Sequence, residues 1–277
     1  MTSLRDTALT FRALHTSAAP LALANVWDAA GARLVADAGA SAVATTSAGV
    51  AWGLGAADGD RLGRERALEL IARVVAAVDV PVTADIESGF GEDPEGVAET
   101  IRGVLAAGAV GVNLEDALHT GSVPLRTPVD QAERIAAARA AADAAGVPLF
   151  INARLDTYLR GVGDGPAERL RETLDRATAY LAAGADGIFV PGVTDPATVA
   201  TLAETLPAPL NVLVGPGAPS VAELGKLGVA RVSLGSAIAE AAYAVVRRSA
   251  RELFETGTYS SLTDTIPYGD LNALLAR

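Results

Sequence analysis

Eight short apolar segments alternate with longer helix-like segments along this chain, and this alternation constrains its fold more than any other feature. The apolar segments are rich in β-branched residues and span 21–27, 41–47, 80–86, 110–116, 148–154, 187–192, 209–214 and 230–235. Between them lie Ala-, Leu-, Arg- and Glu-rich stretches with helical spacing, for example 64–78, 94–108 and 167–184. Eight strands that alternate with helices predict an α/β fold, a (β/α)8 barrel of the TIM type.

Glycines and prolines at the expected boundaries support this count of elements. Several expected helices end in a glycine suited to the left-handed position after a helix, in the stretches ADAGA, LAAGAVGV, DAAGVPL and LAAGADGI. Asp93-Pro94 and Asp195-Pro196 are typical of an N-cap and the first residue of a helix. The main rival is an open doubly wound sheet, but NVWDAAGA stands where that fold usually has its glycine-rich phosphate loop.

The chain has no linker, low-complexity segment or charge block that would divide it. We therefore expect its 277 residues to form one barrel domain, 1–277. Residues 236–256 predict a long amphipathic helix, and 257–277 follow it as an additional segment. This C-terminal helical extension, 236–277, packs either on its own barrel or on a neighbouring subunit, and the residues alone do not choose.

Composition excludes several classes of function. There are 33 Asp and Glu residues against 22 Lys and Arg, without a basic run, which argues against nucleic-acid binding. The chain has no cysteine, so disulfides and thiolate chemistry are excluded, and two histidines, His15 and His119, are too few for a multi-His zinc site. The N-terminus lacks the apolar core of a signal peptide, and no apolar run reaches the roughly 18 residues of a membrane span. We expect a cytoplasmic protein without membrane contact.

Polar residues gather where the expected strands end. In a barrel these ends share one mouth, where function is found. The residues at the strand ends are Asn25, Asp28, Thr45, Thr46, Ser47, Asp85, Glu87, Asn113, Glu115, Asp116, Asn152, Arg154, Asp156, Asn211 and Ser233. Asp85 and Glu87 share one strand end and Glu115 follows the next strand, so a cation is needed to offset their repulsion. Oxygen ligands without His or Cys favour Mg²⁺, with Mn²⁺ as a substitute.

Arg154 ends a third strand of the same group. A guanidinium opposite a metal is a two-pronged clamp for a carboxylate or phosphonate. Metal and clamp together suit a small 2-oxo acid whose enolate form the metal stabilises.

Plainer structural roles compete with this interpretation. A single acid at a strand end is more often an N-cap or loop residue than a ligand, and Asp28 suits the N-cap of the following helix better than catalysis. Arg154 has a competing role as a bridge to Asp156 or Asp116. His119 lies in the loop after the fourth strand, where a lone histidine is usually only solvated.

Four motifs in order resemble the isocitrate lyase / phosphoenolpyruvate mutase superfamily, over residues 11 to 240. They are NVWDAAGARLVADAGASAVATTSAGVAWGLGAADGD, VPVTADIESGFG, GVNLED and INARLDTYL. The resemblance implies a (β/α)8 barrel that binds Mg²⁺ and a small 2-oxo or 2-hydroxy acid, as in 2-methylisocitrate lyase-like or phosphonomutase-like members. It also implies a homo-oligomer, a dimer or tetramer, with 236–277 at the contact.

The resemblance also assigns roles to individual residues. Asp85 matches the direct metal ligand, and Asp58, Glu87 and Glu115 match acids that hold the metal through waters. The substrate-binding positions implied by the family are Thr46, Ser47, Ala48, Asp85, Arg154 and Asn211, with the 46–48 turn holding a carboxylate largely through its N–H groups.

Three departures separate this chain from the best-known branches. The region after strand four, ALHTGSVPLRTPVDQAERI, lacks the Lys-Lys/Arg-Cys-Gly-His signature of the isocitrate and methylisocitrate lyases. It also lacks the Lys and Asn-Ser arrangement of the phosphonate mutases. Strand six ends in Val190-Pro191-Gly192, where methylisocitrate lyases place a glutamate.

We predict a Mg²⁺-dependent lyase that cleaves a C–C bond in a small 2-oxo or 2-hydroxy acid or diacid through an enolate. Asp58, Arg154 and His119 are its predicted catalytic residues, and His119 or a water on the mobile loop 117–127 is the proton donor. Two alternatives stay open. One is a C–P bond enzyme of the phosphoenolpyruvate mutase or phosphonopyruvate hydrolase type, and the other is a protein that binds a 2-oxo acid without turning it over. The sequence does not choose the substrate or the bond that breaks.

Overall fold

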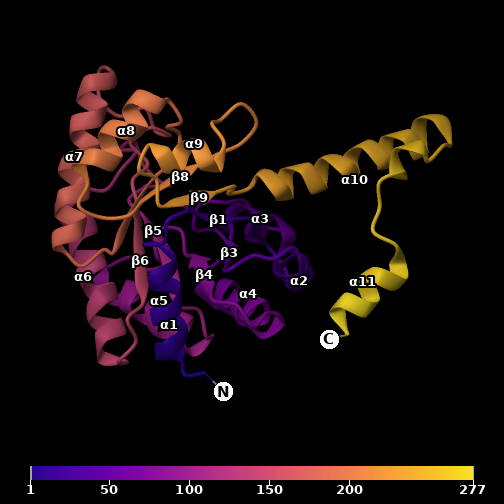
Figure 1. Ribbon diagram of the computed structural model, residues 1–277, viewed down its shortest axis with the longest axis horizontal. Helices are drawn as coiled ribbons and strands as arrows, with labels where there is room; N and C mark the ends of the chain where they lie inside the picture. The colour runs from indigo at the N-terminus through magenta and orange to yellow at the C-terminus, as the bar shows by residue number, and fades with distance from the viewer. Residues whose placement is uncertain (1, 277) are drawn as a thin grey trace.

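The computed structural model describes residues 2–276 of the chain. Parallel strands form the inner wall of its barrel (Figure 1). They are β1 (Leu21–Leu23), β2 (Asn25–Val26), β3 (Val43–Thr45), β4 (Val82–Asp85), β5 (Gly111–Glu115), β6 (Phe150–Arg154), β7 (Gly187–Val190), β8 (Leu210–Leu213) and β9 (Arg231–Ser233). The strands run in the order β1-β9-β8-β7-β6-β5-β4-β3-β2. Only Ala24 separates β1 from β2, so these two are halves of one strand that joins both ends of the sheet. The expected (β/α)8 barrel of the TIM type is confirmed.

Helices between the strands surround this wall as the sequence predicts, and further helices follow the last strand. They are α1 (Leu4–Leu14), α2 (Ala29–Asp37), α3 (Ser47–Gly53), α4 (Arg64–Ala77), α5 (Pro94–Ala106), α6 (Pro128–Ala144), α7 (Pro166–Ala182), α8 (Pro196–Thr205), α9 (Val221–Lys226), α10 (Ala237–Thr256) and α11 (Tyr268–Leu275), with the 3-10 helix η1 (Ser260–Leu262). Among residues 2–276, no helix has the length and apolar character needed to cross a membrane.

The predicted helix boundaries have the local chemistry expected of them. Asp93 and Asp195 are N-caps, and each accepts the backbone N–H of the third residue of its helix, which begins with a proline. Asp28 caps α2 through the N–H of Gly31, at 2.6 Å, which confirms its structural role. The glycines that follow α2, α5, α6 and α7 all have positive φ, as the left-handed position after a helix requires.

Helix α1 closes the N-terminal end of the barrel. Its Phe11 is fully buried, and the Phe11 ring meets the ring of Phe150, at the start of β6, edge to face at 5.8 Å between centroids. His15 stacks on the same Phe150 ring at 3.8 Å. A methyl group at Gly111 would lie 2.5 Å from the Phe11 ring, so the fit between helix and strand depends on glycine. The barrel is therefore sealed at this end.

A polar layer fills the barrel above this seal. Asn152 donates through Nδ2 to Oδ1 of Asn113, at 2.9 Å, and to Oδ1 of Asn211, at 3.0 Å. Arg231 donates through Nη2 to the same Asn113 oxygen, at 3.2 Å. Burial lowers the pKa of Arg231 to about 9, so this side chain remains cationic at neutral pH. The layer links the apolar floor to the strand ends at the opposite mouth.

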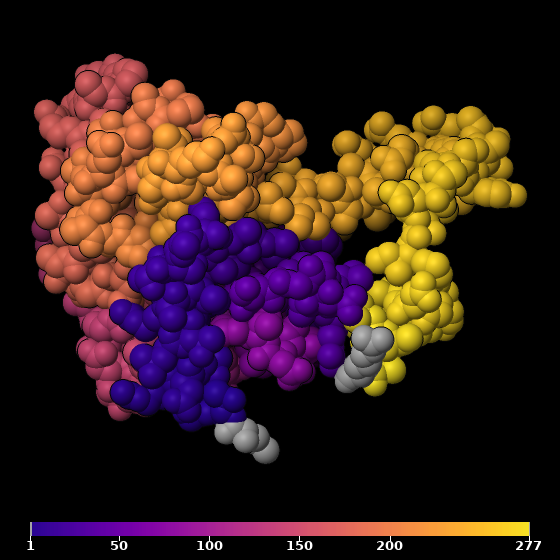
Figure 2. All heavy atoms as spheres, in the orientation of Figure 1, coloured from indigo at the N-terminus to yellow at the C-terminus, as the bar shows by residue number. Residues whose placement is uncertain are grey.

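The C-terminal segment leaves the barrel as an arm, which we define as residues 236–276; Arg277, the last residue of the predicted extension, lies outside the described residues. Figure 1 shows α10 projecting away from the strands, and Figure 2 shows α11 folded back toward the barrel, where it packs against α2. The arm exposes large apolar side chains, including Val246 at 63%, Phe254 at 84% and Tyr268 at 85%. A cavity of about 590 Å³ lies on the barrel beside β1, lined largely by apolar residues such as Leu21 and Val232. The predicted C-terminal helical extension is confirmed.

Candidate active site

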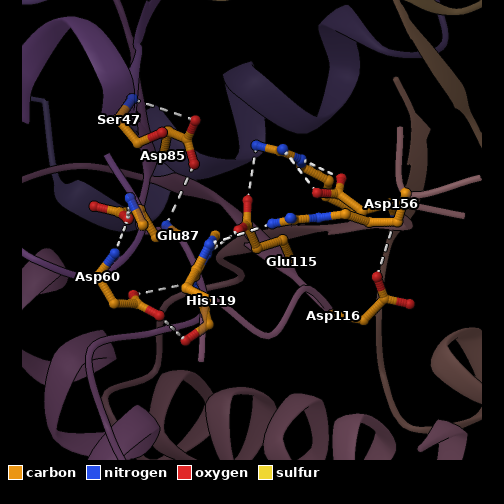
Figure 3. A network of polar contacts seen from close by, with 12 residues as sticks. Ser47, Asp60, Asp85, Glu87, Glu115, Asp116, His119 and Asp156 are labelled. Atoms are coloured by element: carbon orange, nitrogen blue, oxygen red, sulfur yellow. Dashed lines mark hydrogen bonds and ion pairs between the residues drawn. The ribbon is translucent and has the colours of Figure 1, made fainter. Parts of the chain in front are cut away.

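The C-terminal ends of β3 to β6 bring the predicted site residues together at one mouth (Figure 3). In the sheet, Asp85 lies beside Asn113, and Glu115 lies beside Arg154. Asp85 and Arg154 are close enough for each charge to shift the pKa of the other group, and the charge of Asp85 also raises the pKa of Glu115. Carboxylates from two strands therefore face an arginine from a third, as expected from the strand ends.

Asp85 presents a partly buried carboxylate at the end of β4. Its own N–H donates to the Thr45 hydroxyl at 2.9 Å, and its carboxylate accepts long hydrogen bonds, both 3.3 Å, from the N–H groups of Ser47 and Glu87. Burial raises the pKa of Asp85, and the charge of Arg154 opposes this shift. A desolvated carboxylate with weak donors is electrostatically suited to a cation.

Glu87 and Asp60 form a reciprocal clasp between two loops. One Glu87 oxygen accepts from the N–H of Gly59, at 2.9 Å, and from the N–H of Asp60. The Asp60 carboxylate in turn accepts from the N–H and the hydroxyl of Ser88. Burial raises the pKa of Glu87 to about 8, the Asp60 N–H opposes this, and the nearby carboxylates raise it further.

The two loops that form the clasp contain non-glycine residues in the left-handed backbone conformation. Within residues 2–276, the non-glycine residues with positive φ are Asp60 (60°), Glu87 (52°) and Phe90 (51°), all in these two loops. Such conformations cost free energy and concentrate at functional sites. Asp58 is exposed on the loop that the clasp holds, and its charge contributes to the raised pKa values of Asp85 and Glu87. The clasp therefore sets where Asp58 lies relative to the mouth.

Glu115 joins the predicted arginine to the predicted histidine. Its Oε2 lies 2.7 Å from Nη1 of Arg154, and its Oε1 lies 2.7 Å from Nε2 of His119. Asp156 contacts Arg154 with both oxygens, at 2.7 Å to Nε and 3.0 Å to Nη2, so the competing bridge to Asp156 is formed. Burial alone would lower the pKa of Arg154, but the charges of Glu115, Asp156 and Asp85 outweigh it and raise that pKa.

His119 has a defined tautomer when neutral. Arg160 approaches its Nδ1 at 3.3 Å, and because arginine only donates, Nδ1 accepts and Nε2 carries the hydrogen that points to Glu115. The bond to Glu115 raises the pKa of His119, against the lowering by partial burial. The loop that bears it is a hairpin of residues 117–125, closed by a β-bridge. His119 is thus a partly buried site residue and not a solvated loop residue.

The arrangement of the acids limits how a metal ion could be bound at the mouth. Within residues 2–276, no three Asp, Glu or His side chains are arranged to hold an ion directly. Glu87 and Glu115 bind protein groups, and Asp58 lies at the edge of the mouth. The residues nevertheless fit one hydrated divalent cation, because Asp85 offers a partly buried carboxylate and the charges of neighbouring carboxylates raise the pKa values of Asp85 and Glu87.

The predicted carboxylate cradle at 46–48 is partly engaged within the protein. The N–H of Thr46 donates to the carbonyl of Val26 at 3.0 Å, and the N–H of Ser47 contacts Asp85. Ala48 is the partly exposed member of the turn. The turn lies beside Asp85, and its role in substrate binding stays a prediction.

Asn211 lies deeper than the other predicted substrate contacts. Its amide nitrogen donates to the carbonyls of Val212 and Arg231 and to the Ser233 hydroxyl, and its oxygen accepts from Asn152. Asn211 therefore belongs to the polar layer below the mouth, and its contact with substrate stays a prediction.

Sequence reasoning missed two groups of residues around the site. One is the Asp60 and Ser88 pair, for which the acid two residues after Asp58 was the available signal. The other is Arg176 and Tyr180 on α7, which contact the fully buried Asp116. Their spacing of four residues on one helix face is a weak signal, because apolar and amphipathic helices share it.

Comparison with known proteins agrees with this geometry. The family model described as phosphoenolpyruvate phosphomutase matches residues 11–254. The chain belongs to the isocitrate lyase / phosphoenolpyruvate mutase superfamily. Members of this superfamily are lyases and mutases, so the chain is classed as an enzyme of this type, and the resemblance stated from its motifs is confirmed.

Three relatives illustrate this membership. An uncharacterized protein from Mycobacterium tuberculosis (strain ATCC 25618 / H37Rv) is 36% identical over 96% of both chains. The 2-methylisocitrate lyase of Escherichia coli (strain K12) is 30% identical over 95% of this chain and 90% of its own. The structure of a candidate lyase/mutase from Burkholderia cenocepacia J2315 superposes with a TM-score of 0.91 at 42% identity, over 99% of this chain and 97% of that one.

Proposed function

We propose that this superfamily member is a Mg²⁺-dependent lyase that cleaves a C–C bond in a small 2-oxo or 2-hydroxy mono- or dicarboxylic acid. The observation that carries the proposal is the juxtaposition of the partly buried Asp85 carboxylate with the Arg154 guanidinium at one barrel mouth. In this proposal a cation on one side and a guanidinium on the other would flank a compact organic anion.

Arg154 retains donors for a substrate carboxylate. Arginine has five N–H groups. Asp156 accepts two of them and Glu115 pairs with a third, so two remain. Two N–H groups on a planar guanidinium match the two oxygens of a carboxylate. In this proposal they hold the substrate's carboxylate, with help from the N–H of Ala48.

The acids divide between holding an ion and shaping the mouth. Asp85 would hold Mg²⁺, or Mn²⁺ in its place, directly, while Asp58, Glu87 and Glu115 would act through waters. When bound, the ion supplies positive charge that stabilises an enolate oxygen. Glu87 and Asp60 keep the Asp58 loop in position, and His119 covers the mouth beside Glu115. The proton that completes the cleavage comes from His119 or from a water next to it.

A C–P bond enzyme of the mutase or phosphonopyruvate hydrolase type is the second candidate. The match to the phosphoenolpyruvate phosphomutase model favours it. The same metal and guanidinium suit a phosphonate as well as a carboxylate.

A substrate screen tests these proposals. Purified protein with Mg²⁺ is incubated with 2-oxo and 2-hydroxy mono- and dicarboxylates and with phosphonopyruvate, and pyruvate, oxaloacetate, glyoxylate and phosphate are measured. Asp85→Ala should abolish the activity found, whereas Asp79→Ala, an exposed acid just before β4, should not. Full activity of Asp85→Ala would refute the mechanism. Phosphate release would select the C–P enzyme, and ligand-induced stabilisation without product would indicate a binding protein.

We also propose that the arm joins two or more copies into a dimer or tetramer. Val246, Phe254 and Tyr268 expose apolar surface that a monomer leaves in water, and the cavity beside β1 offers apolar surface of its own. A second copy that covers both supplies the missing burial.

A further inference from the structure

Asp156 fixes the plane of the Arg154 guanidinium. Its two oxygens meet Nε and Nη2 at 2.7 and 3.0 Å, an in-plane two-point contact that restrains rotation of the guanidinium. Asp156 is itself only 1% exposed, so this contact is shielded from water. The direction of the remaining Arg154 donors therefore depends on where Asp156 lies.

Asp156 is held in turn by Asp116 at the end of β5. The N–H of Asp156 donates to Oδ1 of Asp116 at 3.0 Å. The other Asp116 oxygen accepts from Nη1 of Arg176 at 3.1 Å and from the hydroxyl of Tyr180 at 2.8 Å. Figure 3 shows Asp116 beside Asp156, on the far side of the network from Asp85. A chain of contacts thus runs from α7 through β5 to the arginine at the mouth.

This chain is built from groups that are costly to bury. Asp116 is fully buried, and Arg176 is nearly so. Arg176 also donates to the carbonyl of Arg126, at 2.8 Å, and to Glu172, at 2.8 Å, so it is anchored at several points. An ion pair in such surroundings is often no more stable than apolar side chains of the same volume. Stability alone therefore gives little reason for polar groups here.

We propose that Asp156, Asp116, Arg176 and Tyr180, the Arg154 brace, are positioning residues that aim the two spare N–H groups of Arg154 at the substrate carboxylate. The inference rests on the proposed function and extends it to α7, outside the barrel wall. None of the four touches the substrate. They act through Arg154, so their loss weakens binding of the carboxylate and leaves binding of the cation unchanged.

Two variants with a matched control test the brace. Asp156→Asn places an NH2 group against Nη2 of Arg154, and Tyr180→Phe removes one hydroxyl from Asp116 with little change in shape. Thr178→Ala, an exposed position on the same helix, is the control. The probe is oxalate, a planar dianion similar to the enolate of a 2-oxo acid, titrated calorimetrically at saturating Mg²⁺. We expect about ten-fold weaker oxalate binding for Asp156→Asn, about three-fold for Tyr180→Phe and no change for Thr178→Ala.

Mg²⁺ binding without oxalate separates positioning from general damage. The dissociation constant for Mg²⁺ should stay within about two-fold of the wild-type value in both variants. Equal losses of Mg²⁺ and oxalate affinity would overturn the brace, as would unchanged oxalate affinity in both variants.

A readout without ligand separates the brace from the proposed function. The Nε–Hε resonance of Arg154, assigned by its loss in Arg154→Lys, should be sharp in the wild type and broadened in Asp156→Asn and Tyr180→Phe. If the resonance is sharp in the wild type and broadened in both variants, but the wild type binds no oxalate, the proposed function fails and the ordering of Arg154 by the brace stands. If it is the same in all variants, the brace fails, whatever the wild type binds.

Discussion

Replacement of Glu87 by Gln should make metal-free protein more stable, and increasingly so as the pH rises. In the folded state burial raises the pKa of Glu87 from 4.5 to about 8. Between these values the folded protein holds a proton that the unfolded chain has released. Stability therefore falls as pH increases through this window, by up to about 1.4 kcal/mol per pH unit from this group.

The size of the effect follows from the same shift. Over the whole window the destabilisation reaches at most about 5 kcal/mol, and structural relaxation reduces this. Gln keeps an oxygen for the N–H groups of Gly59 and Asp60, so the clasp survives in Glu87→Gln. The variant has no titrating group at position 87. Its free energy of unfolding should therefore exceed that of the wild type by about 1 kcal/mol near pH 5.5 and by several kcal/mol near pH 8.

Urea unfolding followed by tryptophan fluorescence, in EDTA at pH 5.5, 6.5, 7.5 and 8, measures this difference. The Asp79→Ala variant, which lacks an exposed carboxylate elsewhere, provides the control. A Glu87→Gln difference that is constant across the range, or that shrinks as pH rises, would refute the reasoning about burial of Glu87.

Three further predictions follow from the site and the arm. Gly59→Ala should destabilise the protein by about 1–2 kcal/mol in thermal or urea unfolding, because Gly59 has a φ of 97° and a methyl group there lies 3.0 Å from the His119 ring; unchanged stability would contradict it. His119→Gln should lower kcat about 100-fold with little change in KM if the histidine donates the proton, and a wild-type kcat would assign the donor to water. Phe254→Asp with Val246→Asp should shift the protein to a smaller species in size-exclusion chromatography with light scattering, and an unchanged mass would remove the arm from the contact.

The fold was predictable because each element carries its own local signal. Apolar strands, N-caps such as Asp93 and glycines after helices all depend on neighbours within a few residues. The direction of the arm was not predictable, because an amphipathic helix has the same pattern whether its partner is its own barrel or another chain.

The site was predictable only where the barrel itself does the positioning. Asp85, Glu115 and Arg154 follow buried strands, and a parallel barrel places such residues at one mouth. The Glu87–Asp60 clasp was not predictable, because it depends on left-handed backbone in two loops that are distant in sequence. The contact between Asp116 and α7 was not predictable for a similar reason, since it joins a strand end to a helix residue 60 positions later in the sequence.

Closure of the barrel floor by α1 has a consequence for the order in which products would leave the site. Phe11 fills that end of the barrel, so in the proposed function a substrate would enter and leave at the strand-end mouth. The proposed lyase would make two fragments, and the fragment nearer the mouth would leave before the one that Arg154 binds. Release in that order would make the inner fragment a competitive inhibitor of the substrate and the outer fragment a noncompetitive one.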